Sequence, residues 1–403
     1  MVKKIIGGAI KMQNNFSLLC SIKIQGYRPF RDFLARLSPL EVIVGANGSG
    51  KSSLFEFLKF LRNVCHHEFP PEIIPGSIGQ QIFHKPGPDK LSWIAEVDMQ
   101  QVGPLCYQAE LMGPVGDAKV VSERVITSES QNQEGDNGHT FLDFTVGRGF
   151  VSDRGSRRDE KWVLGKPNQL ALGSIADSTF VTLFNLREYM RGWRFYDSFN
   201  INNEKIRRPV PTTQKPVLNE DCGNLSAVLF YLMTEHREAF EELQTHIRTA
   251  IPNFQGLNIK ARGAPGEVIA YWREDNVDCE LSLADLSDGT LRFISWATLC
   301  IMPTPATLIC IDEPDQGVHP RTLPILAGLF EKASARTQII MSTHASYFLT
   351  QFDIDRISIM KKVRGESVYV KVKDSKTLLD NLQDFGIEEL SRMHQTDELE
   401  ALS

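Results

Sequence analysis

One short stretch restricts the possible folds of this chain more than any other feature. Residues 45–52 read GANGSGKS and match the pattern G-x-x-x-x-G-K-[ST] in full. The glycines allow backbone N–H groups to turn inward around a triphosphate, and a helix that follows would point its positive end at the same charge. The apolar stretch EVIVG precedes the match, and Leu54, Leu58 and Leu61 follow it at helical spacing. The stretch therefore predicts a strand, a phosphate-binding loop and a helix.

The residue types in this loop indicate its ligands. Lys51 would reach the β- and γ-phosphates of a bound nucleotide, and the Ser52 hydroxyl would bind Mg²⁺. We therefore expect ATP and Mg²⁺ as cofactors. The residues predicted to bind the nucleotide here are Gly45, Asn47, Gly48, Ser49, Gly50, Lys51, Ser52 and Ser53.

A pair of carboxylates follows the apolar run LICI at residues 308–311. Such a continuous run is typical of a strand buried on both faces of a parallel sheet. Asp312 and Glu313 are neighbours, and neighbours on a strand point to opposite sides, so they need different roles. In phosphoryl transfer one carboxylate holds the metal shell and another group activates water. We assign Mg²⁺ to Asp312 and the water, as general base, to Glu313; the alternative is a solvated acidic turn.

Further polar residues extend the predicted site. His344 follows the apolar run IIMST, and its imidazole would hydrogen-bond a γ-phosphate oxygen. The glutamine that contacts magnesium or water has three candidates, and the sequence does not choose among them: Gln80, Gln81 and Gln101. His319, in GVHP, fits loop architecture as well as a functional role.

The rest of the chain alternates strand and helix patterns. Residues 91–166 contain short apolar runs between polar turns and predict an antiparallel meander, whereas residues 171–250 are mainly helical in pattern. Residues 288–301 and 321–335 predict two more helices. We divide the chain into an N-terminal half of the predicted ATPase unit, a helical lobe, a C-terminal half and a tail, at residues 16–170, 171–255, 256–353 and 354–403.

The order of five motifs resembles a known group. GANGSGKSS, LSDGT, LICIDEP, PDQGVHP and STH occur in the order of the ABC-type ATPase heads of the RecF, SMC and OLD-like proteins. SIKIQGYRPFRDF resembles their opening hairpin, and CGNLSAVL followed by IPNF resembles the helical lobe of bacterial predicted ATPases of this group. The resemblance covers residues 16–350. It implies an α/β P-loop NTPase fold of ABC-ATPase type, with a mixed sheet, an antiparallel β meander and a helical lobe.

The resemblance also implies a role for the turn LSDGT. In these families the turn caps a helix and docks on the nucleotide held by a partner subunit. Ser287 would donate its hydroxyl to a γ-phosphate, and Gly289 would allow close approach because it has no side chain. We therefore expect a homodimer or higher oligomer that encloses ATP. The triplet Asp288-Gly289-Thr290 departs from the Gly-Gly-Gln of transporters and disfavours that class.

Several functions fit these motifs. The leading hypothesis is an ATP hydrolase that acts as a sensor or motor in anti-phage defence or DNA repair and controls a separate nuclease or toxin effector. The missing heptad region disfavours a chromosome-tethering rod, and the residues after 354 lack the carboxylate cluster of an OLD-type nuclease. The alternatives are a non-hydrolysing ATP-dependent scaffold, an ATPase subunit of a transporter, and a small-molecule kinase, for which Ser287 would have no function.

Composition limits the partners. The formal net charge of −6 means that DNA binding would need a local basic patch, and the candidates at 154–161, 204–210 and 361–373 are short or mixed in charge. DNA is therefore a possible partner only. The 7 cysteines form no C-x-x-C pair, which favours reduced thiols. No apolar run reaches the ~20 residues of a membrane helix. We expect a cytoplasmic protein with no membrane contact.

Overall fold

A parallel sheet lies at the centre of the fold. The computed structural model describes residues 16–65, 82–100, 102–114, 118–128, 139–153, 158–175, 177–198, 203–376 and 392–395. In this part of the chain the central sheet has 6 strands, and all neighbours are parallel except β17 and β18. Their order is β10 (Trp193–Asp197), β15 (Leu308–Asp312), β16 (Gln338–Ser342), β3 (Leu40–Val44), β17 (Ile357–Val363) and β18 (Glu366–Lys371). Because β3, β15 and β16 are parallel, the segments that follow them meet at one edge of the sheet.

Both faces of the central strands are buried, as their continuous apolar runs predict. Ile43, Cys310 and Ile340 belong to one buried cluster. The residues beside them in sequence, including Val42 and Ile311, belong to a second cluster on the other face. Alternate side chains of each strand therefore enter different cores, and a polar face would be costly on either side.

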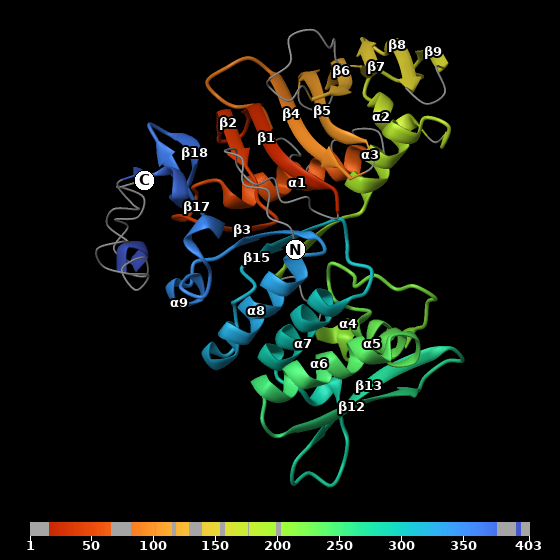
Figure 1. Cartoon of the computed structure of the whole chain (residues 1–403), viewed down its shortest axis with the longest axis vertical. Coiled ribbons are helices and arrows are strands. Elements are labelled where there is room, and N and C mark those ends of the chain that lie inside the picture. Colours follow the sequence, from red (N-terminus) through yellow and green to blue (C-terminus); the bar gives the residue numbers. More distant parts are fainter. Residues whose placement is uncertain are drawn as a thin grey trace, which may run out of the picture.

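A second sheet lies over the first and is antiparallel throughout. Its order is β2 (Phe30–Arg36), β1 (Leu18–Tyr27), β4 (Lys90–Met99), β5 (Gly103–Met112), β6 (Lys119–Thr127), β7 (Thr140–Thr145), β8 (Arg148–Asp153) and β9 (Arg158–Val163). Strands β4 to β9 pair in sequence order, so the predicted meander is confirmed. The helix α1 (Lys51–Val64) lies between this sheet and β3 (Figure 1) and buries Phe57 and Leu58 in the same cluster as Trp93 of β4 and Ile43 of β3.

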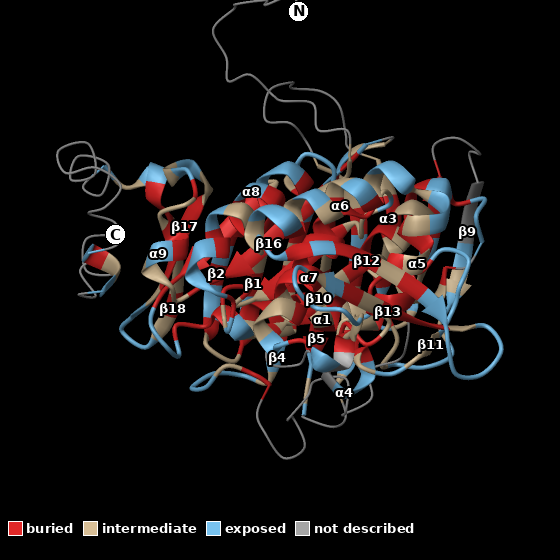
Figure 2. Cartoon of the chain, turned by 90° about the horizontal axis from the view of Figure 1, so that it is seen from below, coloured by how far each residue is buried: buried red, intermediate tan, exposed pale blue. Residues whose placement is uncertain are grey.

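A third, smaller sheet and a group of helices form the opposite lobe (Figure 1). The sheet contains β11 (Val210–Pro211), β12 (Phe254–Ala261), β13 (Glu267–Glu274) and β14 (Leu281–Ser282). The helices of this lobe are α4 (Asn203–Ile206), α5 (Leu225–Glu235), α6 (Arg237–Ala250), α7 (Asp288–Ile301) and α8 (Leu323–Ser334). Figure 2 shows buried residues along the central strands and exposed residues on the outward turns of α6 and α8. The remaining helices are α2 (Ala171–Ser174), α3 (Val181–Arg191) and α9 (Ser346–Leu349).

The sheet order differs from the sequence-based division in two places. The segment 171–250, expected to be mainly helical, also supplies β10, which pairs with β15 in the central sheet. The segment after 354, expected to be a separate tail, supplies β17 and β18, and β17 pairs with β3. The strands β10 and β17 pair with strands that lie far away in the sequence, so local periodicity does not reveal their place in the sheet. The bounds of the four segments themselves remain a prediction.

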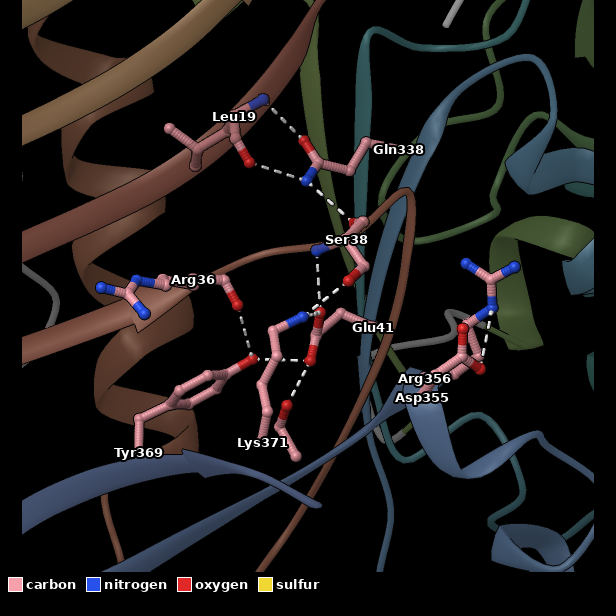
Figure 3. Close-up of polar contacts among 10 residues, drawn as sticks. Leu19, Arg36, Ser38, Glu41, Gln338, Asp355, Arg356, Tyr369 and Lys371 are labelled. Atoms are coloured by element: carbon pink, nitrogen blue, oxygen red, sulfur yellow. Dashed lines mark hydrogen bonds and ion pairs between the residues drawn. The ribbon is translucent and has the colours of Figure 1, made fainter. Parts of the chain in front are cut away.

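A buried polar network joins the C-terminal hairpin to β3 (Figure 3). Glu41 of β3 is fully buried, and Lys371 of β18 is 6% exposed. Lys371 Nζ donates to Glu41 Oε2 at 2.9 Å, and the Ser38 backbone N–H donates to the same oxygen at 2.8 Å. Glu41 Oε1 accepts from Tyr369 Oη at 2.6 Å and from Ser358 Oγ. Because both carboxylate oxygens are bonded, the network fixes β18 against the strand that leads into the phosphate loop.

One glutamine connects the two large sheets. Gln338 of β16 accepts from the Leu19 backbone N–H through Oε1 and donates to the Leu19 carbonyl through Nε2, both at 2.9 Å (Figure 3). Leu19 lies in β1 of the antiparallel sheet.

Among the described residues, no helix combines the length and apolar character needed to cross a membrane.

Candidate functional site

The backbone of the phosphate loop has the shape that its glycines permit. Gly45, Gly48 and Gly50 have φ values of 152°, 77° and 112°. A Cβ at Gly45 would lie 1.9 Å from the Met360 carbonyl oxygen, whereas a Cβ at Gly48 would meet nothing within 4 Å. The loop is therefore held closely against β17 on one side and borders open space at Gly48.

The interior of the loop suits a triphosphate. The N-cap of α1 is Gly50, which has no side chain to cap the first turn, so within the described structure the N–H groups of this turn are available to an anion. Lys51 is 6% exposed and donates to the carbonyl oxygens of Gly45 at 2.6 Å and Ala46 at 3.2 Å. The Ser49 hydroxyl is buried and has no hydrogen-bond partner within the described chain. A cation, free amide groups and an unsatisfied hydroxyl thus gather in one small loop, and these groups fit a nucleotide phosphate.

Side-chain oxygen atoms that could bind a metal ion lie close together beside the phosphate loop. Ser52 Oγ in the first turn of α1 lies 3.5 Å from Asp312 Oδ2 at the end of β15. Ser342 Oγ, at the end of β16, donates to Asp312 Oδ1 and fixes this carboxylate. Hydroxyl and carboxylate oxygens are the ligands that Mg²⁺ prefers, with phosphate oxygens and water completing the shell. These residues therefore fit a Mg²⁺ ion that would bind with the nucleotide.

Glu313 has an unusual backbone conformation. Its φ is 52°, in the left-handed region that a residue with a Cβ rarely adopts. Its N–H donates to the Ser342 carbonyl at 3.1 Å, and its carbonyl accepts from Ser198 Oγ and from the Gln316 N–H. The strand ends at Asp312, so this turn, rather than the expected strand alternation, separates the two carboxylates.

Glu313 and His344 form a pair near the loop. Glu313 Oε1 lies 3.5 Å from His344 Nε2, and the two side chains are 18% and 30% exposed. Burial, together with the charges of Asp312 and Asp315, raises the pKa of Glu313 above its ordinary value. Burial, together with Lys51, lowers the pKa of His344. A carboxylate of raised pKa is a stronger base, which suits proton abstraction from water.

A second buried acid supports the segment that carries His344. Asp315 Oδ1 accepts from Thr343 Oγ1 at 2.7 Å, and Thr343 Oγ1 accepts from the Ala345 N–H at 3.0 Å. Asp315 is 9% exposed, and its burial raises its pKa. Sequence reasoning missed Asp315, Ser342 and Ser198. Asp315 lies in the motif PDQGVHP, which could have pointed to it. Nothing in the sequence around Ser342 or Ser198 indicates their roles.

The turn LSDGT begins the helix α7. Ser287 is the N-cap, and its Oγ accepts from the Thr290 N–H at 3.2 Å. Arg207 Nη2 donates to the Leu286 carbonyl and to Asp288 Oδ1, each at 3.2 Å. Ser287 itself is exposed. Arg207 thus fixes the turn, and the Ser287 hydroxyl is bonded within it, 2.9 Å from Thr290 Oγ1.

A depression of about 630 Å³ lies against this turn. A Cβ at Gly289 would lie 2.5 Å from the Gly317 carbonyl, so the helix start packs directly on the PDQGVHP segment. His319 Nδ1 accepts from the Arg321 N–H at 3.2 Å, which supports the architectural reading of this histidine. The residues that line the depression include Ser287, Gly289, Thr290, Gly317, His319 and Arg321.

The structure therefore separates the predicted residues into two groups. Lys51, Ser52, Asp312, Glu313 and His344 lie together at the edge where β3, β15 and β16 end. Ser287 and Gly289 line the separate depression. The three glutamine candidates, Gln80, Gln81 and Gln101, lie outside the described residues.

The basic residues of one candidate for DNA contact, the segment 204–210, have partners within the chain. In the segment 204–210, Lys205 pairs with Asp221 at 2.7 Å, Arg208 with Glu204 at 3.8 Å, and Arg207 holds the turn described above. The side chains of 154–160 lie outside the described part of the chain. The segment 204–210 is therefore paired with neighbouring acids and with the turn LSDGT at residues 286–290, which we call the signature turn.

Comparisons with known proteins agree with this geometry. A family model described as "AAA ATPase domain" matches residues 18–133, and one described as "AAA domain, putative AbiEii toxin, Type IV TA system" matches residues 170–350. These two matches support the resemblance to the ABC-type ATPases of the RecF, SMC and OLD-like group. The predicted fold class is confirmed by the sheets described above and by the solved structures that follow.

Solved structures share the fold of this chain. An Smc head bound to the C-winged helix domain of ScpA is 13% identical, with 87% of this chain and 96% of that chain covered and a TM-score of 0.58. An Smc head domain with an extended coiled coil, bound to the C-terminal domain of ScpA and derived from Pyrococcus furiosus, is 11% identical, with 91% and 100% covered and a TM-score of 0.55. No curated protein matches the sequence.

Proposed function

We propose that this chain hydrolyses ATP with Mg²⁺ and that two or more copies assemble around the nucleotide. The observation that carries the first part is the Glu313–His344 pair beside a phosphate loop, with the Glu313 carboxylate held in a strained turn. A carboxylate at this position can accept a proton from an attacking water.

Each residue then has a distinct role. Lys51 and the first turn of α1 bind the phosphates, and Ser52 and Asp312 hold Mg²⁺, which neutralises phosphate charge when bound. Glu313 accepts a proton from the attacking water. His344 donates a hydrogen bond to a γ-phosphate oxygen, and because its pKa is lowered it does so as a neutral imidazole.

The second part of the proposal rests on the signature turn. Ser287 is exposed, caps a 14-residue helix and borders a depression that also contains Arg321. A hydroxyl, a helix start and a guanidinium would together complete the phosphate site of a second copy. Each copy would thus finish the pocket of its neighbour, and hydrolysis would release the pair.

We further propose that assembly and release control a separate effector, such as a nuclease or toxin, in anti-phage defence or DNA repair. The family description that names a toxin and a toxin–antitoxin system supports this context. The related Smc heads are bound to another protein, ScpA, which supports a partner-controlling role for such a head.

Phosphate release from the purified chain tests the catalytic assignment. Glu313→Gln should lower turnover by at least about 100-fold and leave ATP binding intact, because it removes the base and keeps the shape. Glu331→Gln, on the exposed side of α8, is the matched control and should behave as wild type. Equal turnover in both variants would reject Glu313 as the base. Assembly on ATP with no phosphate release from wild type would instead favour the non-hydrolysing scaffold.

A further inference from the structure

The C-terminal segment 392–395 lies against the loop that carries His344. Met393 is 1% exposed and belongs to the same buried cluster as Phe348 and Leu349 of α9. A methionine buried to this degree anchors its segment, because exposing it would cost about 1.5–3 kcal/mol. The segment is therefore anchored in the core that also contains α9.

A side chain of this segment bonds directly to the start of α9. His394 Nδ1 and Ser346 Oγ are 2.8 Å apart, and Ser346 follows His344 by two positions. The positive charge that His394 can carry contributes to the lowered pKa of His344, so the two imidazoles lie within electrostatic reach. The segment is thus part of the surroundings of the proposed γ-phosphate contact.

The loop needs such support from outside. α9 has only 4 residues, and its N-cap, Ala345, makes no side-chain cap hydrogen bond. A single helical turn is not stable by itself. On one side of His344, Thr343 is bonded to Asp315; on the other side, Ser346 is bonded to His394. His344 therefore lies between two anchors, and one of them comes from the C-terminal segment.

We propose that His394 is a positioning residue for the ATPase site, which holds Ser346 and thereby fixes His344 toward the γ-phosphate. The expected change in turnover rests on the proposed ATP hydrolysis. The expected support of the loop around Ser346 does not. The proposal assigns a role in the active site to the segment 392–395, which follows β18 in the sequence.

The kinetic test uses the full-length chain. His394→Ala should lower kcat about 3- to 10-fold, the worth of one hydrogen bond, and leave the KM for ATP unchanged. His394→Asn keeps a side-chain hydrogen-bonding group near the place of Nδ1 and should restore most of the rate. His246→Ala, on the surface of α6, is the matched control and should have no effect. A kcat that is unchanged in His394→Ala, or a rate that Asn fails to restore, would overturn the proposal.

A second measurement does not depend on turnover. Hydrogen exchange of amides 343–349 should be about 3- to 10-fold faster in His394→Ala than in wild type, with the exchange of β3 amides unchanged. Equal exchange at 343–349 would overturn the proposal even if the chain hydrolyses ATP. Faster exchange in a chain whose wild type releases no phosphate would uphold the anchor and reject the proposed hydrolysis.

Discussion

Glu313 Oε1 and His344 Nε2 lie 3.5 Å apart, at the ends of the neighbouring parallel strands β15 and β16. The pairing Asp312↔Ser342 sets their separation, because each functional residue follows its strand by one or two positions. The chemistry of the site thus depends on strand register, and a slip by one residue would separate the pair.

The histidine of this pair can be tested without loss of the base. His344→Ala should lower kcat about 10- to 100-fold, since it removes a donor to charge that develops on the γ-phosphate, and should change the KM for ATP little. Steady-state phosphate release at saturating Mg²⁺ measures both constants. A raised KM with an unchanged kcat would mean that His344 contributes to ground-state binding only.

The signature turn should depend on Arg207. Arg207→Ala removes both hydrogen bonds that hold Leu286 and Asp288, so the turn should lose its fixed geometry and ATP-dependent assembly should weaken about 10-fold. Mass measurement across a concentration series with ATP gives the dissociation constant. Arg208→Ala, next in sequence but exposed and paired with Glu204, is the control. Equally weakened assembly in both variants would mean that assembly depends on the positive charge of this segment and not on the geometry of the turn.

The buried pair in Figure 3 should control stability. Lys371→Met leaves Glu41 buried without its cation and should lower the free energy of unfolding by about 3–5 kcal/mol, as for other broken buried pairs. The double variant with Glu41→Gln should recover part of this loss. Urea unfolding followed by tryptophan fluorescence measures it. Arg31→Met breaks the exposed pair with Glu366 and should leave the unfolding midpoint almost unchanged.

A buried glutamate should make stability depend on pH. Glu123 is fully buried, and burial raises its pKa to about 7, although it accepts from Tyr107 Oη and from the Ala171 and Leu172 N–H groups. Between its ordinary value of 4.5 and about 7, the folded state therefore holds a proton that the unfolded state has lost. The contribution of Glu123 to stability is therefore greatest below this window and falls as the pH rises through it.

The Glu123→Gln variant isolates this effect. The free energy of unfolding of wild type, relative to Glu123→Gln, should fall by roughly 3 kcal/mol between about pH 4.5 and pH 8. Glutamine does not titrate, so other groups cancel in the difference. A difference that stays constant with pH would show that Glu123 keeps one charge state throughout.

The phosphate loop and the meander were predictable because their signals are local. Residues 45–52 carry the whole loop pattern in one stretch, and β4 to β9 pair in sequence order. The pairing of Glu41 was not predictable, since its cation, Lys371, lies 330 positions away in the sequence. The hydrogen bond between Ser346 and His394 and the pairing of β10 with β15 could not be predicted for the same reason. In each case the decisive neighbour is set by the tertiary fold.

The central claim is that two copies share their nucleotide pockets. The signature turn has a function in this account only if it completes the pocket of another copy. Lys51→Ala and Ser287→Arg should each abolish turnover alone. In a mixed pair, one pocket combines an intact phosphate loop with an intact signature turn, so equal mixing should restore up to about a quarter of the wild-type rate. We predict this recovery of phosphate release. No recovery, with mixed pairs demonstrated by mass, would contradict the shared pocket.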